Sequence, residues 1–151
     1  PAARRRIALE HDSECFDLVA VLRLHRLTGI PVIFDMLHFQ LRNPQQLGLA
    51  EALGLALATW PPGVRAEAHL SSQRTEAHLQ ARPRAAPHII APRPGQHSDY
   101  VNPFECIQLL GAARGLAPFD LMLEAKAADL ALLRLRDDLR RYAPELGSRV
   151  L

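Results

Sequence analysis

The sequence predicts an α/β fold in which four strands alternate with helices. Two observations lead to this class: short apolar runs recur at four places along the 151 residues, and a stretch with helical apolar spacing follows each of them. Consecutive strand-helix units build parallel sheets with right-handed crossovers. Four units amount to half of a TIM-type (β/α)8 barrel, which usually takes about 250 residues, so we expect either a half-barrel or a small open sheet.

The first unit is a strand over residues 6–10 followed by a helix over residues 15–27. Side chains in residues 12–14 can cap the start of this helix, and Gly29 can end it. Phe16 is among the apolar positions that we expect on its buried face.

The second unit is a strand over residues 31–35 and a helix that opens at Asn43-Pro44. This helix runs to Leu57 and stops before Pro61-Pro62, because proline cannot continue a helix. A third strand is predicted over residues 64–70.

Residues 71–98 separate the third strand from the third helix. They are rich in Arg, Pro, Gln, Ser and His and have little periodicity, which predicts a long ordered loop or a flexible insertion where substrate contacts can form. The third helix is expected from Asn102-Pro103 to Gly115, the fourth strand over 120–124 and a last helix over 125–142. The apolar positions expected to form the buried face of the last helix are Leu130, Leu133, Leu135 and Leu139.

Composition limits the class of protein. Hydrophobic residues make up 48% of the chain, enough for one core, and no run of about 18 apolar residues predicts a membrane span, so we expect a cytoplasmic protein that contacts no membrane. Cys15 and Cys106 lie far apart and are expected to be reduced thiols. The formal net charge is +2, and Lys126 is the sole lysine among eighteen basic residues. Arginine can bind phosphate through two nitrogens, but this charge alone does not prove a nucleic-acid partner.

Each apolar run ends at or near side chains that can bind a metal ion. Because parallel barrels gather the carboxyl ends of their strands at one rim, these side chains should converge there. Glu67 is included because residues two apart on a strand share a face, which gives it the same orientation as His69. The candidate ligands at the strand ends are Glu10, Asp35, His38, Glu67, His69 and Glu124.

Several stretches of the sequence resemble the UV damage endonuclease family. They begin at Ala8-Leu9-Glu10-His11-Asp12, and the longest is Asp120 to Leu132, which reads DLMLEAKAADLAL. The order of the stretches and their positions at strand ends match the family as well. The resemblance covers nearly the whole chain but only the carboxyl-terminal half of the family's barrel. The matching stretches are residues 8–12, 29–38, 69–76, 92–100 and 120–132.

The resemblance implies a TIM-barrel fold related to endonuclease IV, of which this chain supplies about the last four βα units. It implies a DNA repair enzyme that nicks UV-damaged double-stranded DNA on the 5′ side of the photoproduct, with a cluster of divalent metal ions. Such an enzyme would work in the cytoplasm and associate with the nucleoid during repair. It implies metal-ligand roles for Glu10, Asp35, His38, His69, His97 and Glu124, among which Glu10, Asp35, His69 and Glu124 are the expected catalytic residues.

The mixture of carboxylates and imidazoles bears on the metal. Carboxylates have two oxygens with which to bridge ions, and a neutral imidazole fixes geometry through one nitrogen. Manganese is the ion that the resemblance implies, with zinc or magnesium as alternatives, and the ligand set suits calcium less well.

Glu67 departs from the family pattern. The family usually has, two residues before the histidine of this strand, a lysine that can be carboxylated to bind metal. We expect Glu67 to replace that modified lysine directly or through a bridging water; the alternative is an exposed glutamate on a site that has lost one metal.

Other roles rest on weaker patterns. Candidate DNA contacts are Arg74, Arg93, Gln96 and Tyr100, because arginine can hold phosphate and tyrosine or glutamine can approach a distorted base. A half-barrel leaves two sheet edges unpaired, so we expect the chain to need the amino-terminal half of the barrel, in cis or in trans. Two alternatives remain open: a related metal-dependent sugar isomerase and a non-catalytic, truncated remnant.

Overall fold

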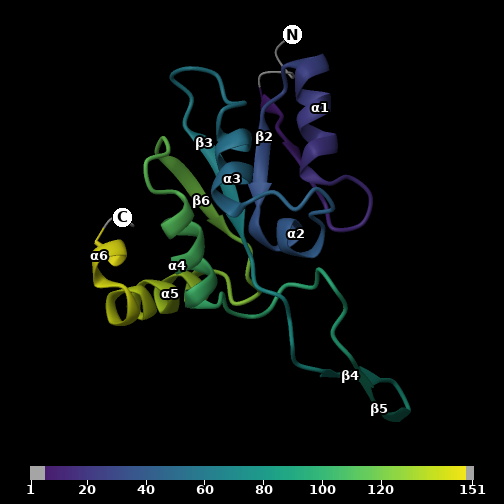
Figure 1. The fold of residues 1–151 in the computed structure, drawn as a ribbon. Coiled ribbons are helices and arrows are strands. Elements are labelled where there is room, and N and C mark those ends of the chain that lie inside the picture. The colour runs from purple at the N-terminus through teal and green to yellow at the C-terminus, as the bar shows by residue number, and fades with distance from the viewer. Residues whose placement is uncertain (1–5, 149–151) are drawn as a thin grey trace.

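The computed structural model describes residues 6–148, which form a four-stranded parallel sheet, a separate two-stranded hairpin and six helices. In chain order the elements are β1 (Leu9–Glu10), α1 (Leu18–Thr28), β2 (Val32–Asp35), α2 (Met36–Leu41), α3 (Leu49–Leu57), β3 (Ala66–Leu70), β4 (His78–Arg82), β5 (Ala85–Ile90), α4 (Pro103–Ala112), β6 (Phe119–Leu123), α5 (Asp129–Tyr142) and α6 (Pro144–Gly147). Figure 1 shows the sheet flanked by helices, with the hairpin standing apart.

The sheet has the strand order β1-β2-β3-β6, and every neighbouring pair is parallel. The register pairs Asp35 with His69 and His69 with Met122, so all four strands end at one edge. This confirms the predicted α/β class and parallel sheet. Within residues 6–148 the sheet is open, with β1 and β6 as its edge strands.

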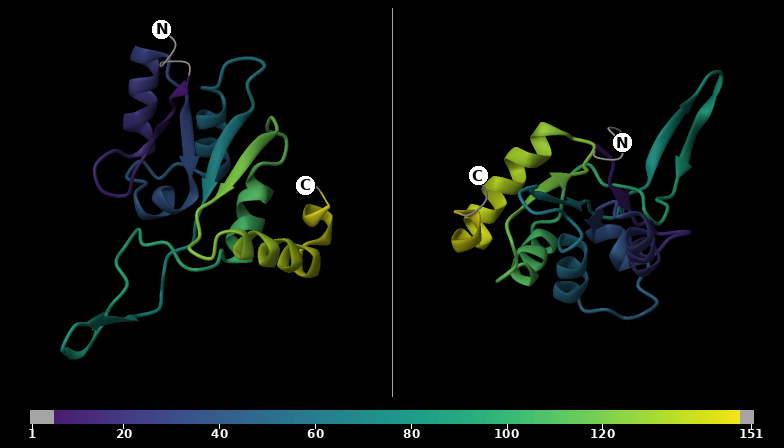
Figure 2. Two further views of the ribbon diagram at one scale, coloured as in Figure 1. Left: turned by 180° about the vertical axis from the view of Figure 1, so that it is seen from behind. Right: turned by 90° about the horizontal axis from the view of Figure 1, so that it is seen from above.

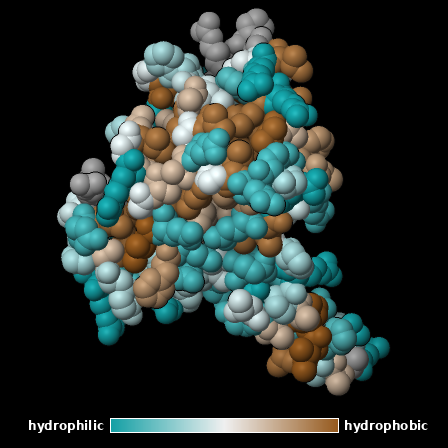
Figure 3. Space-filling model, viewed as in Figure 1, coloured by the Kyte–Doolittle hydropathy of each residue, from teal (hydrophilic) through white to brown (hydrophobic). Residues whose placement is uncertain are grey.

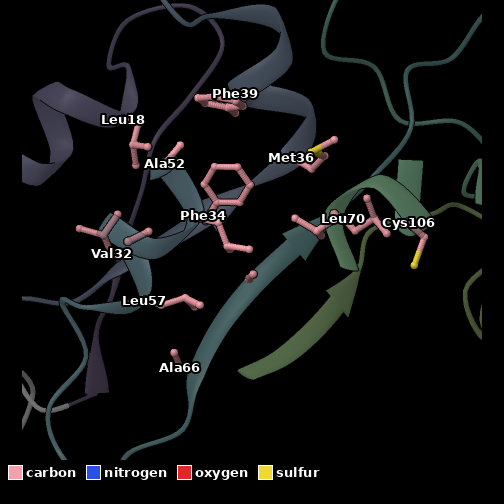
Figure 4. Close-up of a cluster of buried hydrophobic side chains, with 14 of the residues drawn as sticks. Leu18, Val32, Phe34, Met36, Phe39, Ala52, Leu57, Ala66, Leu70 and Cys106 are labelled. Atoms are coloured by element: carbon pink, nitrogen blue, oxygen red, sulfur yellow. The ribbon is translucent and has the colours of Figure 1, made fainter. Parts of the chain in front are cut away.

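One face of the sheet forms the hydrophobic core. Phe34 and Leu70 are fully buried against helices α1, α3 and α4, and Figure 4 shows Phe34 at the centre of this cluster. The other face of the sheet carries Glu67 and Met122 and is partly exposed. Helices therefore cover a single face and leave the opposite one open. The buried strand residues of the core are Val32, Phe34, Ala66, Ala68 and Leu70.

Helix α1 starts three residues later than predicted. Asp12 accepts hydrogen bonds from the backbone of Glu14 and Phe16 and thereby closes a turn before the helix. Asp17 is the actual cap, accepting from the Ala20 amide at 2.9 Å. Phe16 consequently lies outside the helix and is 55% exposed, so its predicted burial was wrong. Gly29 ends the helix in the left-handed conformation, as predicted.

The second predicted helix was wrong in its first part. Asn43 forms a local turn, accepting from the Leu47 amide at 3.0 Å and donating to the Leu47 carbonyl at 2.9 Å, and α3 begins only at Leu49. A short helix that the sequence did not predict, α2, follows β2 directly. Asp35 caps it by accepting from the His38 amide at 2.7 Å.

Residues 71–98 contain more regular structure than predicted. β4 and β5 form an antiparallel hairpin in which Leu79 pairs with Ile89, and Pro83 and Arg84 occupy its turn. Both faces of this hairpin are largely exposed. Sequence periodicity did not reveal it because no buried face imposes alternation on its residues.

The carboxyl-terminal helices follow the prediction in part. Asn102 caps α4, with Pro103 at its first position, as predicted. Helix α5 begins at Asp129 because residues 125–128 form a turn. Leu130 and Leu133 are exposed, which corrects the predicted face; the buried positions, spaced four apart, are Ala131, Leu135 and Leu139. No helix in residues 6–148 is long and apolar enough to span a membrane.

Candidate metal centre

Four side chains from four strands converge at the carboxyl edge of the sheet. Glu10 ends β1, Asp35 ends β2, His69 lies near the end of β3, and Glu124 follows β6. Each offers a ligand-type atom, and these atoms all lie within 4.8 Å of one another. We call these four residues the ligand cluster. Parallel pairing puts the strand ends together, which is why residues far apart in sequence meet here.

The other predicted ligands adjoin the ligand cluster. His38 Nδ1 lies 3.2 Å from Glu10 Oε1, and His97 Nε2 lies 3.7 Å from Glu124 Oε2. Glu67 Oε1 lies 3.0 Å from His69 Nε2. The structure thus brings all seven predicted metal residues into one contiguous group.

Asp35 connects this group to the fold. It is fully buried, and its Oδ1 holds the first turn of α2, which carries His38 to within 3.7 Å of the same oxygen. Its Oδ2 is buried with no hydrogen-bond partner in the described part of the chain.

Burial raises the pKa of the Asp35 carboxyl. An unpaired buried polar atom costs about 1–3 kcal/mol, and more when it is charged, so a cation at Oδ2 fits this oxygen.

His69 faces two carboxylates with one nitrogen. Its Nδ1 lies 3.4 Å from Glu10 Oε2 and 3.5 Å from Glu124 Oε1, yet it makes no hydrogen bond to a described residue. A nitrogen and two carboxylate oxygens facing one another without hydrogen bonds form a donor set suited to a divalent ion.

The pKa values show how the charges balance without metal. The hydrogen bond to Glu10 raises the pKa of His38 to about 9. Burial alone would lower the pKa of His69, but Glu10 and Glu67 raise it to about 9. Burial would likewise raise the pKa of Glu10, yet the His38 and His69 imidazoles facing it lower that pKa to about 2. Two imidazolium groups therefore neutralise part of the carboxylate charge at neutral pH.

His11 has a role that the sequence analysis did not predict. It is fully buried, its Nε2 accepts from the Asp35 amide at 3.1 Å, and its carbonyl accepts from His38 Nδ1 at 2.8 Å. Burial lowers its pKa to about 4, which keeps the ring neutral and able to accept. It therefore orients two neighbouring ligand candidates. Its position directly after Glu10 is the only sequence signal for this role.

Two of the predicted DNA contacts hold the loop together. Arg74 has a side chain only 13% exposed, lies 3.5 Å from Asp99 and donates to the Glu76 carbonyl. Gln96 accepts from the Arg93 amide at 3.2 Å.

The other two predicted contacts are accessible. Arg93 is exposed, and Tyr100 is 38% exposed with the Arg134 guanidinium 4.7 Å from its ring centre. An open hollow of about 710 Å³ adjoins the ligand cluster; His97, Glu124 and Lys126 contribute to its lining. A substrate group can therefore reach the cluster from this side.

Comparisons with known proteins identify similar chains. The family model described as UV-endonuclease UvdE matches residues 2–146. The UV DNA damage endonuclease of Bacillus velezensis is 29% identical over 138 residues, which cover 90% of this chain and 38% of the relative. That of Clostridium perfringens is 25% identical over 150 residues, covering 98% of this chain and 32% of the relative.

A solved structure is also similar. The crystal structure of SacUVDE superposes with a TM-score of 0.68 at 27% identity, covering 91% of this chain and 40% of that one. This chain thus spans 32–40% of the length of these three proteins.

Proposed function

Because this chain belongs to the UV-endonuclease UvdE family, we propose that it is the metal-binding part of a DNA repair endonuclease that hydrolyses the phosphodiester bond 5′ to ultraviolet photoproducts. The observation that carries the proposal is the ligand cluster, in which Oδ2 of buried Asp35 has no hydrogen-bond partner in the described part of the chain. Its cellular setting would be the cytoplasm, in association with the nucleoid during repair.

The cluster residues divide into two groups in this proposal. Glu10, Asp35, His69 and Glu124 would hold a central divalent ion, Asp35 through its Oδ2. His38 and His97 would hold a second ion, since each adjoins a carboxylate of the ligand cluster. Glu67 takes the place of the family's carboxylated lysine beside His69. Manganese is the proposed ion, with zinc or magnesium as alternatives.

The chemistry that this arrangement suits is phosphodiester hydrolysis. Bound divalent ions would supply the charge that activates water and neutralises the transferring phosphoryl group. The chain's own side chains hold that charge in place: Asp35 is fixed by helix α2, and His38 is fixed by the His11 carbonyl. UV-damaged duplex DNA is the proposed substrate, with Arg74, Arg93, Gln96 and Tyr100 nearby as proposed contacts.

The proposal includes a completed barrel. The open sheet face and the two edge strands suit a further four βα units, supplied in cis or in trans. A second hollow, of about 860 Å³, supports this; it lies beside Ile33 and Glu67 and is lined by Trp60 and Val64.

The test is nicking of plasmid DNA by the complete polypeptide that carries this chain. Ultraviolet-irradiated plasmid should be nicked with added manganese, and undamaged plasmid should stay supercoiled. Chelation should abolish nicking. The control variant Asp120→Asn should nick irradiated plasmid like wild type. Asp120 is a carboxylate on β6 that pairs with Arg65 outside the ligand cluster. Full metal occupancy without nicking would refute the repair function and favour a sugar isomerase.

A further inference from the structure

The β4–β5 hairpin, which we call the arm, projects away from the rest of the molecule. Figures 1 and 2 show it beyond the carboxyl edge of the sheet, and Figure 3 shows it as a separate protrusion. Strands of five and six residues at about 3.3 Å each give it a length of roughly 17–20 Å. That length corresponds to about five base pairs of duplex DNA, at about 3.4 Å per base pair.

The base of the arm is attached to the metal centre. The Gln73 side chain donates to the Arg93 carbonyl at 2.8 Å and accepts from the Gly95 amide at 2.8 Å. These two hydrogen bonds connect the segment before the hairpin to the segment after it. Gln73 also pairs with His97 through a backbone bridge. The arm thus has a fixed starting point beside a proposed metal ligand.

The ionisable side chains of the arm are all basic. Residues 78–90 contain two arginines, two histidines and no acidic residue. Arg82 and Arg84 lie at the far end and are exposed, and within residues 6–148 no hydrogen bond or ion pair involves their guanidinium groups. Leu79 and Ile89, paired across the strands, are 69% and 66% exposed. A two-stranded ribbon of this kind fits the major groove of B-DNA.

Arg84 occupies a position that favours glycine. Its φ is +59°, in the left-handed region, where a non-glycine residue is held at a cost of order 1 kcal/mol. Among residues 6–148, no hydrogen bond or ion pair to the Arg84 side chain offsets this cost. An arginine at the tip is therefore explained better by binding of a partner molecule than by a contribution to the stability of the fold.

We propose that the arm is a DNA-binding element that contacts phosphates about five base pairs away from the metal centre, through Arg82 and Arg84. This inference rests on the proposed function, since it takes duplex DNA as the partner. The contact is independent of sequence and of damage, because the backbone phosphates carry the same charge at every base pair.

The test compares Arg84→Gly with wild type in the complete polypeptide, with binding of an undamaged 30-base-pair duplex measured by fluorescence anisotropy across a salt series. Arg84→Gly should weaken binding by about 5–10-fold and reduce the slope of log affinity against log salt by about one. Its thermal midpoint should stay the same or rise, since glycine suits φ +59°. Arg23→Ala, which removes an exposed arginine from α1, is the control and should leave affinity and slope unchanged.

The outcomes are separable. If wild type binds no duplex at all, the proposed function itself fails. If wild type binds duplex and nicks irradiated plasmid but Arg84→Gly binds equally well with the same slope, the arm is not a DNA contact. If the double variant Arg82→Ala/Arg84→Gly lowers the thermal midpoint and leaves affinity intact, the arm packs against another part of the protein, which also overturns the inference.

Discussion

Asp35 has two oxygens with different tasks. Oδ1 accepts from the His38 amide and starts helix α2, whereas buried Oδ2 has no partner among residues 6–148. One side chain therefore joins the local fold to the ligand cluster. A single substitution can therefore separate the structural role of Asp35 from its proposed role in binding metal.

The Asp35→Asn variant should keep the fold and lose the metal. Asparagine caps helices about as well as aspartate, and it removes a charge whose burial is unfavourable. The thermal midpoint of metal-free protein should therefore be unchanged or higher, while nicking should fall by roughly 100-fold or more. Calorimetry and metal analysis check this, and an unchanged metal content would contradict the role given to Oδ2.

Glu67 can be tested by two substitutions that differ in charge. Glu67→Ala should lower the number of metal ions retained after dialysis, because it removes the carboxylate 3.0 Å from His69 Nε2. Glu67→Gln keeps a hydrogen-bond acceptor but no negative charge. If Glu67 replaces the family's modified lysine, Glu67→Gln should lose as much metal as Glu67→Ala. Wild-type metal content in both variants would show that Glu67 does not bind metal.

The two raised histidine pKa values predict opposite pH trends for stability and metal binding. His38 and His69 have pKa values of about 9 in the metal-free protein, above the 6.5 of an unperturbed histidine. Their stabilising ion pairs are therefore fully formed below about pH 6.5 and are lost as the pH rises through 9. Metal must displace the same protons, so manganese affinity should rise over this window.

Thermal midpoints of chelator-treated protein at pH 6.5 and 9, together with manganese titrations at both values, check the two trends. The stability of the metal-free protein should fall while metal affinity increases. A manganese affinity that is equal at the two pH values would mean that neither histidine binds the ion.

Among the elements, helix α1 shows how a local signal sets a boundary. Gly29 ends the helix at φ +69° and its amide bonds the His25 carbonyl. Gly29→Ala should lower the free energy of unfolding by about 1 kcal/mol, because alanine is strained in the left-handed region.

Gly111→Ala is the matched control for Gly29→Ala. Gly111 lies within α4, where a Cβ would meet nothing within 4 Å, so this change should raise stability by about 0.5–1 kcal/mol. Urea unfolding of both variants measures the difference. Equal effects of the two substitutions would contradict the cap assignment.

The helix boundaries that could be predicted from the sequence are those marked by capping residues. Gly29 and Asn102-Pro103 mark boundaries that the structure confirms, because their conformational preferences act locally. Asn43-Pro44 resembles the same signal, yet Asn43 bonds Leu47 in a turn. The arm gave no signal at all, since neither of its faces is buried.

On the scale of the whole molecule, the sheet is covered on one face only. Ile33 and Glu67 border the second hollow, and Val64 and Ile7 are exposed at 53% and 48%. If further strands complete a barrel, the 151-residue chain alone should bind a hydrophobic dye such as ANS and unfold at lower temperature than the complete polypeptide. Equal thermal midpoints and no dye binding would argue against the completed barrel.

The sequence by itself determined the strand-helix alternation, the parallel sheet and which candidate metal ligands stand at the strand ends. Apolar periodicity and side-chain chemistry are local properties of the sequence. Parallel pairing then places the carboxyl ends of all strands at the same edge of the sheet. Family membership followed from the same residues and is confirmed by the match over residues 2–146.

Tertiary structure alone decided how those ligands are held. His11 supports both Asp35 and His38, and Gln73 ties the arm to His97, through contacts between residues far apart in sequence. The burial of Asp35 Oδ2, which has no partner within residues 6–148, likewise results from packing. Such contacts depend on the distances and burial that packing creates, and no local preference of an amino acid encodes them.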